Sequence, residues 1–215
     1  NSTKEAVAKA RTAAEIPGVT AILTANPWYN KPTQEGQFQH FKAVADAVKL
    51  PVVLYNIPGR SAANLEPATV MRLIEACPNL AAVKESSGSL VQITDLLTQA
   101  PREFQVYSGD DMMSLGVLGG GGMGLVSVVS NLIPGEMAEM VRAALANDWS
   151  LARRINRRYF RLMQGIFKET SPGPVKAILA MMGRIGEHYR LPMVPVSPAT
   201  RAALERLAGE LGLLV

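Results

Sequence analysis

Ala81-Ala82-Val83-Lys84-Glu85-Ser86-Ser87-Gly88 is a short apolar run that gives way abruptly to charged and small polar residues. Its apolar part does not alternate with polar residues, and Val52-Val53-Leu54 upstream has the same character. A β-strand without alternation is typical of a parallel sheet that is buried on both faces. The stretch therefore predicts a buried parallel strand with Lys84 at its carboxyl end.

Units of this kind recur along the chain, each with an apolar run, a turn and an amphipathic helical stretch. The predicted strands are 20–24, 51–56, 80–84, 104–108 and 124–129. The predicted helices that follow them are 33–48, 67–76, 90–100, 112–118 and 134–146. Repeated βα units of about 20–30 residues predict an α/β protein with a parallel sheet, either a closed barrel or a doubly wound open sheet.

Both ends of the chain are predicted to be helical. Asn1-Ser2-Thr3 followed by Glu5 is typical of a helix start, and this helix is expected to run to about Glu15. The α/β part is expected to cover residues 1–146, and residues 147–215 are expected to form a C-terminal helical region. Breaks are predicted at 147–148, 171–174 and 191–198, before a final amphipathic helix over 198–211.

The composition allows a sizeable core and disfavours several classes of protein. Apolar residues make up 48% of the chain and charged residues 19%. The net charge is +4, but the basic pairs Arg153-Arg154 and Arg157-Arg158 lie on a helical pattern, which favours a solvated helix face over a nucleic-acid site. A single cysteine, Cys77, excludes an internal disulfide and fits a reducing cytosol. No membrane span or signal peptide is predicted, so we expect a cytoplasmic protein.

Lys84 has two interpretations from its position alone. Burial lowers the pKa of a lysine, and a neutral amine can attack a carbonyl carbon to form a Schiff base. Alternatively, Lys84 marks the point at which the strand leaves the core and reaches water. Functional residues of parallel α/β folds gather at the carboxyl ends of strands, which keeps the first interpretation open.

Other strand ends carry further candidates. Tyr55 could transfer protons beside Lys84, or it could be a core tyrosine with a satisfied hydroxyl. Arg60 could hold a substrate carboxylate in a bidentate pair, or it could be an ordinary surface arginine. Trp28 and Tyr29 form an aromatic pair in a proline-rich loop, which suits a subunit contact, a lid or local packing.

Two other features are not expected to bind a ligand. The glycine-rich segment 119–124 lacks the Lys-Ser/Thr of a phosphate-binding loop and precedes a strand, so it is predicted to connect a helix to a strand. His40 and His188 have no second ligand at metal-binding spacing, so no metal is expected.

Several segments together resemble one family, the 4-hydroxy-tetrahydrodipicolinate (dihydrodipicolinate) synthases of the pyruvate-dependent class I aldolase superfamily. The matching segments extend over essentially the whole chain and are Tyr29-Asn30-Lys31-Pro32-Thr33-Gln34-Glu35-Gly36, Tyr55-Asn56-Ile57-Pro58-Gly59-Arg60, Val83-Lys84-Glu85, Tyr107-Ser108-Gly109-Asp110-Asp111, and Pro174-Val175-Lys176 with Leu191-Pro192-Met193. The resemblance implies a (β/α)8 TIM barrel, of which this chain would cover about strands 4–8, followed by a C-terminal helical region.

The same resemblance implies a lyase that condenses pyruvate with L-aspartate 4-semialdehyde in lysine and diaminopimelate biosynthesis, without metal or cofactor. Lys84 would form the Schiff base, with Tyr55 assisting proton transfer. Tyr29 would complete the proton relay of a neighbouring subunit in a homotetramer built as a dimer of dimers. Arg60 would hold the carboxylate of the semialdehyde. Backbone positions that line the pyruvate pocket would be Gly109 and Val126.

The chain departs from the family pattern at several points. The family barrel has three further strands, which carry the threonine pair that binds the pyruvate carboxylate, so these 215 residues alone are expected to lack synthase activity. Trp28 stands where many members have tyrosine, and Ser61 where threonine is common. Asn1 and Glu5 match positions of the lysine feedback site, but with Trp28 changed the sequence leaves feedback inhibition open.

Two other functions compete with this interpretation. Another aldolase of the superfamily, such as an N-acetylneuraminate lyase or a keto-sugar-acid aldolase or dehydratase, would share Lys84 and Tyr55. Gly59-Arg60 favours the synthase, because a carboxylate clamp there suits aspartate semialdehyde. The second alternative is an inactive barrel protein that acts as a binding module, which the intact Lys84, Tyr55 and Arg60 disfavour.

Overall fold

The structure, a computed structural model, describes residues 1–214 and divides the chain into two compact units. The first unit is Asn1–Val126, and the second begins at Ser127. All the predicted site residues lie in the first unit. The boundary that we predict at residue 146, between an α/β part and a helical region, stays a prediction.

The first unit contains a parallel sheet of five strands in the order β1-β2-β3-β4-β5. The strands are β1 (Ile22–Ala25), β2 (Val52–Asn56), β3 (Leu80–Glu85), β4 (Gln105–Ser108) and β5 (Gly124–Leu125). A doubly wound sheet reverses its strand order at a switch point, whereas the strands of a barrel follow one another in sequence. The strictly sequential order is therefore that of a barrel.

The fifth strand is shorter than predicted. We expected a strand over 124–129, but β5 ends at Leu125, and Val129–Asn131 form a 3-10 helix, η1. Ser127 and its neighbours bend the chain there, and the Ser127 Oγ accepts a hydrogen bond from Ser130 N at 2.8 Å. The run resembles a strand in sequence because it is apolar, but its serine side chains form hydrogen bonds that favour a turn.

One helix, α1 (Thr3–Ala14), precedes β1, and further helices connect successive strands of the first unit. The connecting helices are α2 (Gln34–Asp46), α3 (Pro58–Ser61), α4 (Pro67–Ala76), α5 (Leu90–Gln99) and α6 (Ser114–Gly119). Thr33 caps α2 by accepting from Gly36 N, and Ser89 caps α5 by accepting from Gln92 N. The short helix α3 was not predicted. It starts at Pro58, which suits the first helical position, and ends at Ser61, followed by Ala62 with φ of 58°.

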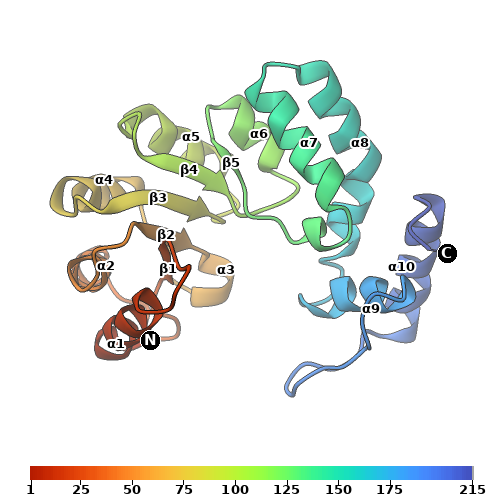
Figure 1. Cartoon of the computed structure of the whole chain (residues 1–215), viewed down its shortest axis with the longest axis horizontal. Helices are drawn as coiled ribbons and strands as arrows, with labels where there is room; N and C mark the ends of the chain where they lie inside the picture. Colours follow the sequence, from red (N-terminus) through yellow and green to blue (C-terminus); the bar gives the residue numbers. More distant parts are fainter. Residues whose placement is uncertain (215) are drawn as a thin grey trace. The chain divides into compact units, whose positions relative to one another are not determined.

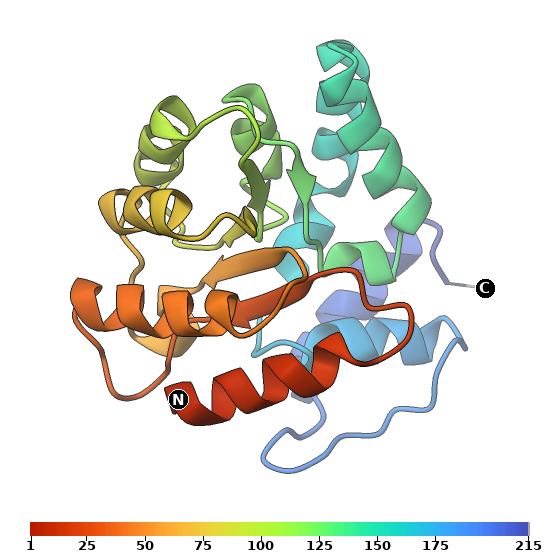
Figure 2. The same cartoon turned by 60° about the vertical axis from the view of Figure 1, so that its left-hand side comes forward.

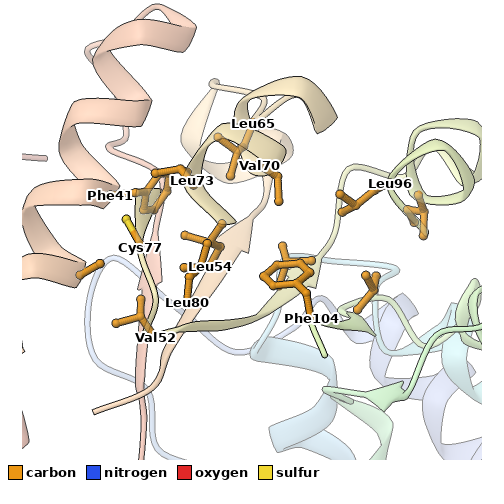
Figure 3. Close-up of a cluster of buried hydrophobic side chains, with 14 of the residues drawn as sticks. Phe41, Val52, Leu54, Leu65, Val70, Leu73, Cys77, Leu80, Leu96 and Phe104 are labelled. Atoms are coloured by element: carbon orange, nitrogen blue, oxygen red, sulfur yellow. The ribbon is translucent and has the colours of Figure 1, made fainter. Parts of the chain in front are cut away.

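The core of this unit lies between one face of the sheet and the helices α2, α4 and α5, which line that face in both views (Figures 1 and 2). Figure 3 shows Phe41 and Leu73 from the helices packed toward Leu54 and Val52 of β2. Burying large aliphatic and aromatic side chains contributes about 1.5–3 kcal/mol each, so this layer supplies most of the unit's stability.

Among residues 1–214 the opposite face of the sheet is only half-buried, so burial of both faces, which the sequence predicts, is not seen in these five strands. Along β2, Val52, Leu54 and Asn56 are buried, whereas Val53 and Tyr55 are intermediate. Apolar and polar residues do not alternate along Val52-Val53-Leu54 because Val53, on the more open face, is also apolar. That open face also carries the candidate catalytic side chains.

The second unit is helical, as predicted, with α7 (Pro134–Leu145), α8 (Trp149–Gly165), α9 (Gly173–Met181) and α10 (Pro198–Glu210). The breaks at 147–148 and before α10 are confirmed, but α9 ends earlier than the sequence suggested. Gly183 has φ of 69°, and the Arg184 and Gly183 amides donate to Leu179 O and Ala180 O. This pattern is a Schellman motif, which stops the helix at its glycine.

The structure bears on two further predictions, which concern the basic pairs of residues 153–158 and membrane-spanning helices. Arg153, Arg154, Arg157 and Arg158 are all exposed on α8, in agreement with the predicted helical pattern. Across residues 1–214, no helix combines the length and the apolar character needed to cross a membrane.

Candidate active site at the carboxyl ends of the strands

Lys84 and Tyr55 lie side by side at the carboxyl ends of two adjacent strands. The parallel register of β2 and β3 pairs Tyr55 with Lys84, and β4 places Tyr107 on the other side of Lys84. The Lys84 Nζ lies 3.9 Å from the centroid of the Tyr55 ring, within cation–π distance. Both side chains are half-buried on the open face of the sheet, so the amine is held in place and remains accessible.

Gly109 lies against the Lys84 side chain from the end of β4. Its backbone N–H donates to Glu85 O at 2.8 Å, which brings the two strand ends together. A Cβ at this position would lie 1.9 Å from Ser86 Oγ and 2.9 Å from Lys84 Cε, so any side chain would displace one of them. The Ser86 Oγ is buried and has no hydrogen-bond partner among residues 1–214. The lack of a side chain at Gly109 thus lets Ser86 Oγ and the Lys84 side chain pack directly against the end of β4.

Val126 and Arg60 lie on neighbouring segments. The Val126 N–H donates to Ser108 O at 2.8 Å, so this residue continues the row of strand ends, and its side chain is 40% exposed. Arg60 is exposed on α3, which directly follows β2 and therefore Tyr55. The arginine is thus attached to the same strand end as the candidate proton-transfer residue.

Tyr29 is not brought against Lys84 within this chain. It lies in the loop after β1 with 83% of its side chain exposed, next to Trp28 with 54% exposed. Tyr29 and Lys31 adopt φ angles of 73° and 48°, a left-handed conformation that non-glycine residues seldom take. Such local strain persists where the surrounding structure or function requires it.

Two buried polar residues of this region were not among the predicted site residues. Asn56 and Glu85, each one position after a candidate catalytic residue, are 0% and 2% exposed. Burial raises the pKa of the Glu85 carboxyl, although hydrogen bonds from Asn56, Ser87 and Gln92 oppose the shift. The sequence signal for Asn56 and Glu85 is a polar residue at a helix-facing position of a strand that is otherwise apolar.

The remaining sequence features have structural roles. The glycine-rich segment 119–124 connects α6 to β5, as predicted. His40 is buried with its Nδ1 2.9 Å from Thr3 Oγ1, and burial lowers its pKa. No group of three or more His, Cys, Asp or Glu residues within residues 1–214 is arranged to hold a metal ion.

Comparison with known proteins identifies the family. The profile of the dihydrodipicolinate synthetase family matches residues 1–211. The chain belongs to this family. It is 70% identical to 4-hydroxy-tetrahydrodipicolinate synthase of Acidobacterium capsulatum and 61% identical to that of Koribacter versatilis, covering 100% of this chain and 71% of each relative.

Solved structures agree with the fold. The crystal structure of the chloride-inhibited dihydrodipicolinate synthase from Acinetobacter baumannii, complexed with pyruvate, superimposes with a TM-score of 0.95 at 37% identity. That superposition covers 99% of this chain and 72% of the other. The predicted fold class is therefore confirmed: β1 to β5 correspond to strands 4–8 of a (β/α)8 barrel.

Proposed function

We propose that this protein is a 4-hydroxy-tetrahydrodipicolinate synthase, which condenses pyruvate with L-aspartate 4-semialdehyde in lysine and diaminopimelate biosynthesis. The observation that carries the proposal is the Lys84 amine, held 3.9 Å from the Tyr55 ring at adjacent strand ends. The relatives that bear this enzyme name and the pyruvate complex of the Acinetobacter baumannii protein support the choice of substrates.

The chemistry follows from a lysine nucleophile. The Lys84 amine adds to the pyruvate ketone through its nitrogen lone pair and, with loss of water, forms an iminium. The iminium withdraws electrons, so a methyl proton leaves and an enamine forms. The enamine carbon attacks the aldehyde of the second substrate, whose amine then displaces Lys84 by transimination and closes the ring. Tyr55 is placed to carry protons during the first steps.

Three residues are proposed to bind the substrates. Arg60, exposed at the start of the segment after β2, holds the carboxylate of the semialdehyde through its guanidinium. Gly109 lines the pyruvate pocket through its backbone, and its lack of a side chain lets the Lys84 side chain pack against it. Val126 lines the same pocket through its backbone, and its N–H bond to Ser108 O fixes its position.

Tyr29 is proposed to act in the site of a neighbouring subunit, within a homotetramer built as a dimer of dimers. Its exposure of 83% and its left-handed φ fit a residue that is ordered by a partner. A cytoplasmic location is also part of the proposal, and it fits Cys77, which is a free thiol.

Reductive trapping tests the function directly. The intact protein is incubated with pyruvate and borohydride and then digested, and the masses of its peptides are measured by mass spectrometry. An adduct on the peptide that contains Lys84 is expected, and a folded protein without this adduct would contradict the proposal. Product formation with aspartate semialdehyde, compared with cleavage of N-acetylneuraminate, separates the synthase from the related aldolase.

Mixing two inactive variants tests the role of Tyr29. In a hybrid of Lys84→Ala and Tyr29→Phe subunits, one of the sites regains both residues if Tyr29 acts across the interface. Activity should therefore return on mixing and subunit exchange. A relay within one subunit predicts no recovery, because each chain would still lack one of the two groups.

A further inference from the structure

The residues directly after Tyr55 and Lys84 carry buried polar side chains on the opposite face of the sheet. Successive residues of a strand point to opposite faces, so Asn56 and Glu85 point toward the helices. They are register partners, and they are 0% and 2% exposed. The neighbouring positions on this face, Leu54 and Val83, are apolar and 0% exposed.

Glu85 is surrounded by neutral donors. Its carboxylate accepts from Asn56 Nδ2 at 3.3 Å and 3.1 Å, one distance to each oxygen. It also accepts from Ser87 N at 2.5 Å and from Gln92 Nε2 at 3.5 Å. The carboxylate thus joins β3 to β2, to the loop that follows Lys84, and to α5.

Asn56 extends this network to β1. Its Oδ1 accepts from Leu65 N at 2.9 Å and from Asn26 Nδ2 at 3.3 Å. Asn26 follows the last residue of β1 and also donates to Ala63 O at 2.7 Å. One continuous set of hydrogen bonds therefore ties together the carboxyl ends of three strands.

Stability alone does not account for this network. A carboxylate among neutral donors costs desolvation energy, and well-packed apolar residues at such a position are often equally stable or more so. Apolar residues do fill the adjacent positions of this face. The hydrogen bonds instead fix the position of β2 relative to β3, because each of them is satisfied only when the two strands keep their register.

We propose that Glu85 and Asn56 are positioning residues, which act from behind the sheet to hold Lys84 and Tyr55 at the distance that imine formation requires. This inference rests on the proposed function, since it assumes that Lys84 reacts with pyruvate. Neither residue touches the substrate in this scheme.

The Glu85→Gln variant of the intact protein tests the proposal by the rate of borohydride trapping. The glutamine keeps the size of the side chain but turns an acceptor oxygen into a donor that faces Asn56 or Ser87. At saturating pyruvate, the trapping rate should fall about 10- to 100-fold, the range expected when a reacting group shifts by about an ångström. The pyruvate concentration for half-saturation should change by less than about 3-fold, because the network binds no substrate.

A matched control distinguishes positioning from a general loss of stability. Val83→Ala changes the residue on the other side of Lys84, also buried against the helices, and should trap pyruvate at nearly the normal rate per folded molecule. Glu85→Gln combined with Asn56→Asp restores a donor–acceptor pair and should recover about 3- to 10-fold of the lost rate.

The outcomes separate this inference from the proposed function. If the unaltered protein forms no adduct on Lys84, both are wrong. If it does, but Glu85→Gln traps pyruvate within about 3-fold of the normal rate, or Val83→Ala loses as much, only the positioning role is wrong. Should Glu85→Gln fail to fold, Glu85→Asp replaces it, with the same loss expected because the shorter side chain cannot keep all its donors.

Discussion

The two faces of the sheet differ in what they contribute, although each strand supplies residues to both. Leu54 and Val83 point toward the helices and lie in a closed apolar core. Tyr55 and Lys84, their immediate neighbours, lie half-buried on the open face with the amine against the ring. A substitution of an apolar residue on the helix side should therefore change the stability of the fold, and a substitution of Lys84 or Tyr55 should change chemistry with little effect on stability.

Removal of the Lys84 amine should have the largest effect on the open face. Lys84→Ala should reduce pyruvate-dependent borohydride labelling to background, because no other side chain can replace the nucleophile. Thermal unfolding should change little, since the cation–π contact with Tyr55 contributes about 1 kcal/mol or less. Lys42→Ala, which removes a half-buried lysine of α2 that pairs with Asp46, should label normally; equal losses in both variants would refute the assignment.

The largest effect on the helix side should come from Leu54. This side chain is 0% exposed within the core, and Leu54→Ala should destabilise the protein by about 2–5 kcal/mol in denaturant unfolding. Trapping of pyruvate per folded molecule should be nearly normal. Val91→Ala, at a site 81% exposed, should cost less than about 0.5 kcal/mol. If the two variants unfold alike, the apolar layer is not the source of stability.

The Tyr55 hydroxyl should have an intermediate effect, confined to chemistry. Tyr55→Phe keeps the ring beneath Lys84 but removes the proton-transfer group, so turnover should fall about 10²-fold. The control is Tyr107→Phe, because Tyr107 flanks Lys84 from the other side and its hydroxyl donates to Gln105. Steady-state kinetics should show little change for Tyr107→Phe, and a similar loss in both variants would contradict a specific role for Tyr55.

The smallest effect should be a pH dependence of stability that arises on the helix side. Burial raises the pKa of Glu85 above 4.5, so the unfolded chain loses this proton at a lower pH than the folded protein does. The contribution of Glu85 to stability therefore falls as the pH rises through and above 4.5. The variant Glu85→Gln should lack this part of the pH dependence. Thermal unfolding midpoints measured across the acidic range would show the difference.

Glu35 provides a control of opposite sign. Hydrogen bonds from Gln39 and Arg72 lower the pKa of this exposed carboxyl. Its contribution to stability is therefore present above the ordinary glutamate pKa and is lost as the pH falls through its lowered value. Glu35→Gln should make the protein less sensitive to acid. The two substitutions should change the pH dependence of the unfolding midpoint in opposite directions. A change in the same direction in both variants would contradict the raised pKa of Glu85.

Much of the sheet could be predicted from local sequence, and the errors have identifiable causes. The runs around Val52 and Val83 predicted parallel strands because β-rich apolar segments at βα spacing have few other uses. The fifth strand is shorter than the sequence predicts because Ser127 begins a turn within an apolar run, and α9 is shorter because Gly183 adopts a positive φ that stops the helix. In both cases a short-range hydrogen-bond pattern prevailed over apolar character.

The sequence by itself determined the parallel α/β sheet and the candidate residues Lys84, Tyr55 and Arg60, because periodicity and motif spacing are local properties of the chain. Only the tertiary structure decided that Lys84 Nζ lies over the Tyr55 ring, that Gly109 lies against its Cε, and that Glu85 is buried with Asn56 behind the site. These contacts depend on the register between strands, and register is set by packing and by hydrogen bonds between residues far apart in the chain.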